Sequence, residues 1–93
     1  MTGLALVGAG RMGAVHLRAL TRTRRVQLRV ICDPSPAAAA LGEAAGVPVE
    51  TELEQTLRRD DVHCVLIAAP TPLHDQLVSL ALAAGKHVLC EKP

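Results

Sequence analysis

The amino-acid sequence predicts an α/β fold, a doubly wound parallel sheet of about five strands with helices on both faces. Three observations support this prediction. Short apolar runs alternate with helical segments along the 93 residues, which is the pattern of parallel strand-helix-strand units. Glycines follow the first apolar run directly, as they do where a strand turns sharply into a helix. The most apolar run, residues 62–69, comes fourth, which places it centrally and predicts the strand order 3-2-1-4-5.

The first three elements lie on either side of these glycines. Residues 4–7 are apolar at every position, as in a strand that is buried on both faces. Residues 11–21 carry apolar side chains at helical spacing and predict a helix. Residues 26–32 predict the second strand, which ends just before an aspartate.

The second helix has signals at both ends. Ser35 predicts the N-cap, with Pro36 at the first helical position, where the N–H that proline lacks would have no partner within the helix. Residues 37–45 are rich in alanine and favour the helix. Gly46 predicts its end, because glycine readily adopts the left-handed conformation that terminates helices.

A short strand and a short helix come next. Residues 47–49 predict the third strand, and Pro48 restricts it to the sheet edge because proline cannot donate to a strand ladder. Thr51 and Glu54 have the spacing of a capping box, which predicts a helix from this point to about Arg59.

The last part of the chain predicts two strands and one helix. Residues 62–69 form the fourth strand and residues 87–90 the fifth. Between them Thr71 predicts a helix N-cap, Pro72 the first helical position and Gly85 the end of the helix. The expected buried stripe of this helix consists of Leu73, Leu77, Leu80, Ala81 and Ala84.

Composition excludes several classes of protein. Ten Lys and Arg against nine Asp and Glu leave a formal net charge of +1, so the basic surface typical of nucleic-acid binding is not expected. No apolar run reaches the roughly 20 residues of a membrane span, and the cytoplasm is the expected location. Cys32, Cys64 and Cys90 are an odd number without C-x-x-C spacing. They predict reduced core thiols and no metal site.

The glycine turn predicts a site for a dinucleotide. Gly8 would permit the tight turn, Gly10 would let the backbone approach a pyrophosphate, and Gly13 would allow the helix to pack closely on the strand. The backbone amides of Arg11 and Met12 would then point at the phosphates, with the positive end of the helix dipole behind them.

Asp33 follows the second strand, where such folds place an acid against the adenosine ribose hydroxyls. A 2′-phosphate about 4 Å from this carboxylate would be repelled by roughly 4 kcal/mol at an effective dielectric constant of about 20. Pro34 and Ser35 supply no compensating positive charge, so NAD is favoured over NADP. The alternative role for Asp33 is that of a turn or capping residue before Pro34.

Taken together, these motifs resemble the Gfo/Idh/MocA oxidoreductase family. The resemblance rests on residues 8–13 with His16, on Asp33, on Ala69-Pro70-Thr71-Pro72-Leu73-His74, and on Glu91-Lys92-Pro93. It implies that residues 1–93 are an N-terminal, NAD-binding Rossmann domain and that a C-terminal substrate domain lies outside this chain. Such enzymes oxidise a secondary alcohol of a sugar, inositol or related polyol, or run the reverse reaction.

The resemblance also implies roles for individual residues. Ala69, Pro70 and Thr71 would lie along the nicotinamide ribose, and Glu91 would lie near it. Lys92 would be catalytic, because an ammonium beside the substrate oxygen stabilises the alkoxide that develops as hydride leaves. In the family the lysine works with an aspartate and a histidine of the second domain.

Some roles stay open at this stage. His74 would reach the cofactor cleft, or else support it as a capping or neighbouring residue. The 93-residue chain alone is expected to be inactive, and an oligomer is expected, if at all, through the other domain. The alternatives to an enzyme are a regulatory module that binds dinucleotide without chemistry and an inactive fragment.

Overall fold

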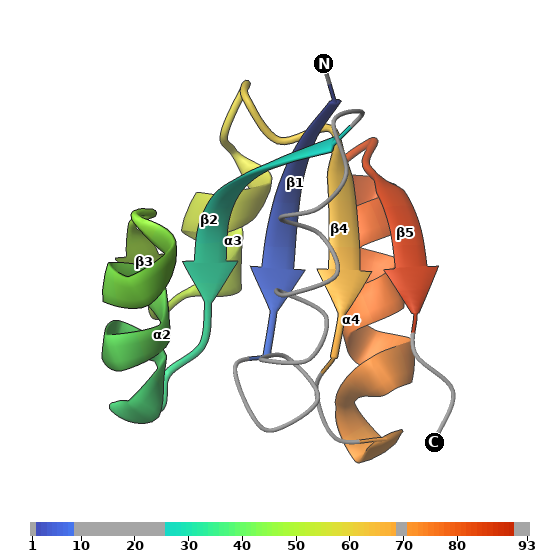
Figure 1. The fold of residues 1–93 in the computed structure, drawn as a ribbon. Coiled ribbons are helices and arrows are strands. Elements are labelled where there is room, and N and C mark those ends of the chain that lie inside the picture. Colours follow the sequence, from blue (N-terminus) through green and yellow to red (C-terminus); the bar gives the residue numbers. More distant parts are fainter. Residues whose placement is uncertain (1, 9–25, 69–70, 91–93) are drawn as a thin grey trace.

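A single parallel sheet organises the chain (Figure 1). The computed structural model describes residues 2–8, 26–68 and 71–90. Its strands are β1 (Thr2–Val7), β2 (Val26–Cys32), β3 (Val49–Glu50), β4 (Cys64–Ile67) and β5 (His87–Cys90). They pair in the order β3-β2-β1-β4-β5, and every pair is parallel. The predicted fold class and strand order are therefore confirmed, whereas the helix predicted at residues 11–21 lies outside the described residues.

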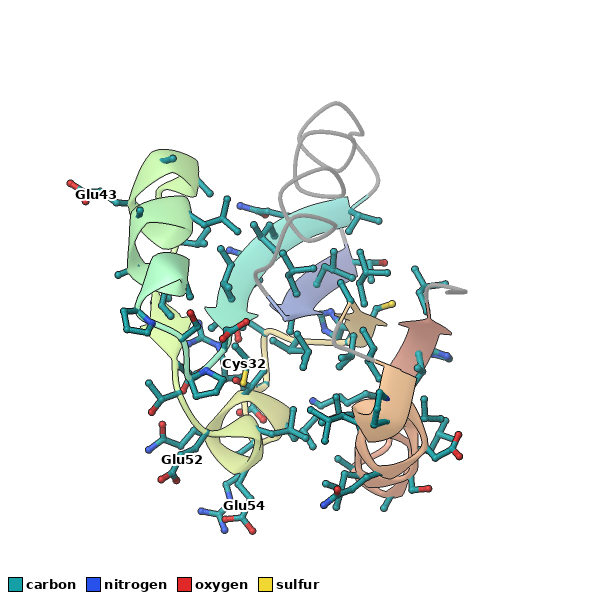
Figure 2. The ribbon with its side chains drawn as sticks, turned by 90° about the horizontal axis from the view of Figure 1, so that it is seen from below. Cys32, Glu43, Glu52 and Glu54 are labelled. Carbon is teal, nitrogen blue, oxygen red and sulfur yellow. The ribbon has the colours of Figure 1, made fainter. Side chains whose placement is uncertain are left out.

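Helices lie on both faces of the sheet, as predicted (Figure 2). They are α2 (Ala37–Ala45), α3 (Leu53–Leu57) and α4 (Thr71–Ala83). Helices α3 and α4 cover one face, where buried side chains of β1, β2 and β4 meet Leu77 and Ala81. Helix α2 packs on the other face, where Ala38 and Leu41 contact the core. The core is thus split into two thin layers by the sheet.

Strand β3 is shorter than predicted and begins at Val49 instead of Val47. The Val47 amide donates to the Gly42 carbonyl at 3.0 Å, so this residue completes the end of α2. Pro48 contributes only its carbonyl, which accepts from the Ile31 amide at 3.0 Å. The edge position inferred from Pro48 is confirmed, because β3 pairs with β2 alone.

The observed N-caps of α2 and α3 each lie one residue after the predicted ones, and α3 ends at Leu57, two residues before the predicted end at about Arg59. Helix α2 begins at Ala37, one residue later than predicted, although Gly46 ends it with a φ of 72° as expected. Helix α3 has Glu52 at the N-cap without a side-chain cap bond, so the capping box assigned to Thr51 and Glu54 is wrong. The chain at Glu52 is still extended, which starts the helix one residue too late for a Thr51 cap.

Helix α4 packs on a different stripe from the predicted one. Ala81 is fully buried and Leu77 is partly buried, as expected, but Val78 packs beside them. Leu73 and Leu80 are each 46% exposed, and Ala84 is exposed beyond the last turn. The helix therefore meets the sheet along residues 77, 78 and 81.

Strand β2 contains one residue more than its partner β1. Leu4 pairs with Leu28, but the next residue of β1, Ala5, pairs with Val30, so Arg29 is the extra residue of a bulge. Side chains alternate regularly on both sides of this break. Leu28 and Ile31 face the α2 layer, whereas Val30 and Cys32 face the layer of α3 and α4.

Candidate functional site

The carboxyl ends of β1 and β2 lie at the end of the sheet that faces the viewer in Figure 2. Ligands of doubly wound sheets bind at this end, where the strand order reverses. Here the reversal lies at β1, because the chain leaves it toward β2 on one side and returns to β4 on the other. Gly8 follows β1 with a φ of 100°, a conformation that L side chains rarely adopt. Its amide donates to the Cys32 carbonyl at 2.9 Å and ties the two strand ends together.

Asp33 stands beside Gly8 at the end of β2, and hydrogen bonds of both its backbone and its side chain hold it there. Its amide donates to the Glu50 carbonyl at 2.9 Å. Its carboxylate oxygen Oδ1 accepts from the Ser35 amide at 2.7 Å, so Asp33 is indeed a turn residue around Pro34. A carboxylate accepts several hydrogen bonds at once, and holding the turn is therefore compatible with binding a hydroxyl.

A pocket of about 250 Å³ opens beside these residues. Its walls come from the ends of β1 and β2, the loop before α3, and the first turns of α4. The lining residues are Val7, Gly8, Cys32, Asp33, Pro34, Thr51, Leu53, Leu73 and Leu77. The lining is mostly apolar, and Asp33 and Thr51 are the lining residues with polar side chains. Such a pocket suits a flat, largely apolar ring attached to a group that carries hydroxyls.

Cys32 forms part of the pocket wall and is only 4% exposed. Figure 2 shows it between the end of β2 and α3. Burial raises the pKa of its thiol, although a hydrogen bond with Thr56 opposes this. The thiol is therefore protonated near neutral pH and is a poor nucleophile. Burial also raises the pKa of Cys64, which is a free thiol like Cys32, as predicted.

No group of three His, Cys, Asp or Glu side chains within the described ranges could hold a metal ion. His63, the residue next to Cys64, lies at the opposite end of the sheet from the pocket. Its Nδ1 accepts from the Gly3 amide at 2.9 Å, and its own amide donates to the Gly3 carbonyl at 2.9 Å. The role of His63 is therefore to connect β1 to the loop before β4.

The structure describes only part of the predicted site. Gly8 and Asp33 lie together at the pocket. Thr71 and His74 lie in the first turn of α4. Leu73 of the same turn lines the pocket, so this turn lies at the same end of the sheet. The remaining predicted residues lie outside the described ranges; they are Gly10, Arg11, Met12, Gly13, Ala69, Pro70, Glu91 and Lys92.

Gly8 and Asp33 were the only pocket residues predicted as part of the site, and those missed include Cys32, Thr51, Leu53 and Leu77. A signal for Cys32 and Thr51 was present, because each lies at the carboxyl end of a predicted strand or in the loop that follows it. The two leucines had no such signal. Helical spacing marked Leu77 as a core residue, and both leucines become pocket walls only because α3 and α4 pack on the same face of the sheet.

A family profile described as "Oxidoreductase family, NAD-binding Rossmann fold" matches residues 2–93. The chain belongs to this family. It is the Gfo/Idh/MocA family, so the resemblance drawn from the motifs is confirmed, as is NAD as the expected cofactor.

Relatives in this family include inositol dehydrogenases. The inositol 2-dehydrogenase of Streptomyces avermitilis is 40% identical over 96 residues, covering 100% of this chain and 28% of that protein. The inositol 2-dehydrogenase of Corynebacterium glutamicum is 41% identical over 93 residues, covering 97% of this chain and 28% of that protein.

Solved structures of Gfo/Idh/MocA relatives have the same fold. A protein from gentamicin A biosynthesis in complex with NAD superimposes with a TM-score of 0.95 at 39% identity, covering 99% of this chain and 27% of that one. The scyllo-inositol dehydrogenase of Lactobacillus casei, solved with NAD(H) and scyllo-inositol, superimposes with a TM-score of 0.91 at 30% identity, covering 100% of this chain and 28% of that one. The chain thus spans about 28% of the length of the curated relatives it matches.

Where the family domain is described, at residues 2–8, 26–68 and 71–90, no helix has the length and apolar character needed to cross a bilayer.

Proposed function

We propose that the pocket at the ends of β1 and β2 holds the adenosine end of NAD, with the Asp33 carboxylate accepting hydrogen bonds from the ribose hydroxyls. The observation that carries this proposal is the position of Asp33. Its side chain is fixed by the Ser35 amide at the mouth of an apolar pocket, directly beside the glycine that ends β1. The adenine ring suits the apolar wall of Leu53 and Leu73, and the ribose suits the carboxylate.

The same carboxylate favours NAD over NADP. A 2′-phosphate would replace a hydroxyl that donates to Asp33 with a group that repels it, by roughly 4 kcal/mol at about 4 Å and an effective dielectric constant of about 20. Solvent and salt reduce this figure at a pocket mouth, so we expect about a tenfold to hundredfold preference. Gly10, Gly13, and the amides of Arg11 and Met12 would bind the pyrophosphate.

We further propose that the longer protein containing this domain oxidises a secondary alcohol of a sugar, inositol or related polyol. NAD, when bound, supplies the hydride acceptor. Lys92 would lie beside the reacting carbinol and stabilise the negative charge on its oxygen. Ala69, Pro70, Thr71, His74 and Glu91 would line the nicotinamide end. Support comes from the inositol 2-dehydrogenases among the relatives and from the neighbour solved with NAD(H) and scyllo-inositol.

Calorimetric titration of the chain with NAD and with NADP tests the cofactor assignment. We expect tighter binding of NAD, and Asp33→Ala should bring the two dissociation constants together. Glu43→Ala is the matched control, because it removes the same charge from a side chain that points away from the sheet (Figure 2). Equal affinity of the unmodified chain for both cofactors would contradict the role given to Asp33.

Activity of the longer protein separates an enzyme from a regulator. With NAD and an inositol as substrates, Lys92→Ala should reduce the rate by roughly 100-fold or more while NAD still binds. A dinucleotide-binding regulator would show no turnover before the substitution. An unchanged rate after it would remove Lys92 from the mechanism.

A further inference from the structure

Thr56 is the one polar residue in the described part of the chain that is completely buried. It lies on α3, next to Cys32 of the pocket wall. Its hydroxyl donates to Glu50 Oε1 at 3.2 Å and also interacts with the Cys32 thiol. Valine has nearly the same shape as threonine and avoids the cost of burying a hydroxyl. The hydroxyl at this position therefore points to a role in holding its partners.

Glu50 connects this hydroxyl to the predicted ribose-binding residue. Its side chain is held by Thr56 and by Arg59, whose Nη1 lies 3.6 Å from Oε1. Its backbone carbonyl accepts the hydrogen bond from the Asp33 amide at 2.9 Å. One residue thus joins a buried anchor on α3 to the position of Asp33.

Strand β3 cannot fix Glu50 by itself. It has only two residues and lies at the edge of the sheet. Its ladder to β2 includes the bonds from the Ile31 amide to Pro48 and from the Asp33 amide to Glu50. A strand this short depends on side-chain anchors for its position. Arg59 is itself oriented by Asp61, to which it donates two hydrogen bonds of 2.9 and 3.0 Å.

We propose that Thr56 is a positioning residue, which acts through Glu50 to hold Asp33 at the mouth of the pocket and so sets the discrimination between NAD and NADP. The effect on cofactor choice depends on the proposed function of Asp33, but the effect on the position of Asp33 does not. The two parts can therefore be tested separately.

Amide hydrogen exchange measured by NMR tests the positioning directly and needs no cofactor. In Thr56→Val the Asp33 amide should exchange about fivefold faster or more, the change expected when a hydrogen bond of ordinary strength is weakened. The Ala68 amide is the internal control, since it donates to Val7 at 2.8 Å on the other side of β1. Thr56→Ser keeps the hydroxyl and should restore the slow exchange of Asp33.

Titration with NAD and NADP tests the consequence for selectivity. A loss of stability alone weakens the binding of both cofactors by the same factor, because it lowers the fraction of folded chain. Thr56→Val should instead reduce the ratio of the two dissociation constants by about fivefold, while Thr56→Ser leaves it unchanged. A wild-type ratio near one would refute the proposed function of Asp33, and the exchange measurement would still decide the role of Thr56.

A second variant covers the case in which Thr56→Val does not fold. Glu50→Ala removes the carboxylate that Thr56 and Arg59 hold, but it keeps the backbone carbonyl that accepts the hydrogen bond from the Asp33 amide. It should also speed exchange of the Asp33 amide relative to that of Ala68. Unchanged relative exchange in the folded variant or variants would overturn the positioning role.

Discussion

Replacement of Gly42 by alanine should destabilise the domain although alanine favours helices. Gly42 lies in α2, and a Cβ at this position would overlap Cγ2 of Val49 and lie 3.0 Å from the Val47 carbonyl oxygen. Carbon atoms pack at about 3.5–4.0 Å, so the Val49 side chain or the helix would have to move. Overpacking of this kind costs about 1–3 kcal/mol, and the deep overlap puts Gly42→Ala toward the upper end. The gain in helix propensity offsets about 0.5–1 kcal/mol, which leaves a net loss of about 1–2 kcal/mol.

Urea denaturation of a double-mutant cycle measures this effect. Val49→Ala opens the space that the new methyl group needs, so Gly42→Ala should cost little or nothing in that background. The coupling free energy should then be at least about 1 kcal/mol. Gly46→Ala is the control, because a Cβ there meets nothing within 4 Å and any cost comes from its φ of 72° alone. That cost should be the same with or without Val49. Absence of coupling between residues 42 and 49 would refute the packing argument.

Three further substitutions or modifications probe other features. Arg59 holds the pKa of the Asp61 carboxyl below its usual value through hydrogen bonds. The resulting stabilisation is present above the unfolded-state pKa of about 3.9 and is lost as pH falls through the lower folded-state value. Asp61→Asn should therefore cost at most about 1 kcal/mol at pH 7 and almost nothing near pH 2, as urea midpoints would reveal. Burial of Cys32 should make its alkylation at pH 7.5 about tenfold slower than that of free cysteine, as measured by peptide mass spectrometry. A rate equal to that of the free amino acid would mean that the thiol is accessible. Gly3→Ala should lower the free energy of unfolding by about 3 kcal/mol or more, because the new Cβ would overlap the backbone carbonyl of Asp61, which cannot move aside as a side chain can. Thermal or urea unfolding measures this loss. A variant as stable as the wild type would show that the loop at Asp61 can move.

The sequence was sufficient for the order of the strands and for the end of the sheet that carries the pocket. Both follow from rules that act along the chain: parallel strands alternate with helices, and a glycine turn and an acid follow the first two strands. Gly46 and Gly85 were also placed correctly, because positive φ values at helix ends favour glycine regardless of what surrounds them.

Features that depend on contacts between distant residues were not predictable in the same way. Leu80 has the spacing of a buried residue but is exposed, because the approach of α4 to the sheet selects Val78 instead. Thr56 looks like an ordinary helix residue in the sequence. Its importance arises only when β3 brings Glu50 next to it, six residues away along the chain.

The bulge at Arg29 sets how far Asp33 stands from the glycine turn. If the same residues formed a regular ladder, with Arg29 opposite Ala5, Val7 would pair with Ile31 instead of Cys32, and Asp33 would lie one residue, about 3.3 Å, further along the strand direction. The distance between the acid and Gly8 is therefore not a function of residue count alone. A domain with one residue fewer in its second strand and a regular ladder would bring its acid to the same place. Searches for this cofactor site by fixed motif spacing should accordingly allow one residue of variation in the second strand.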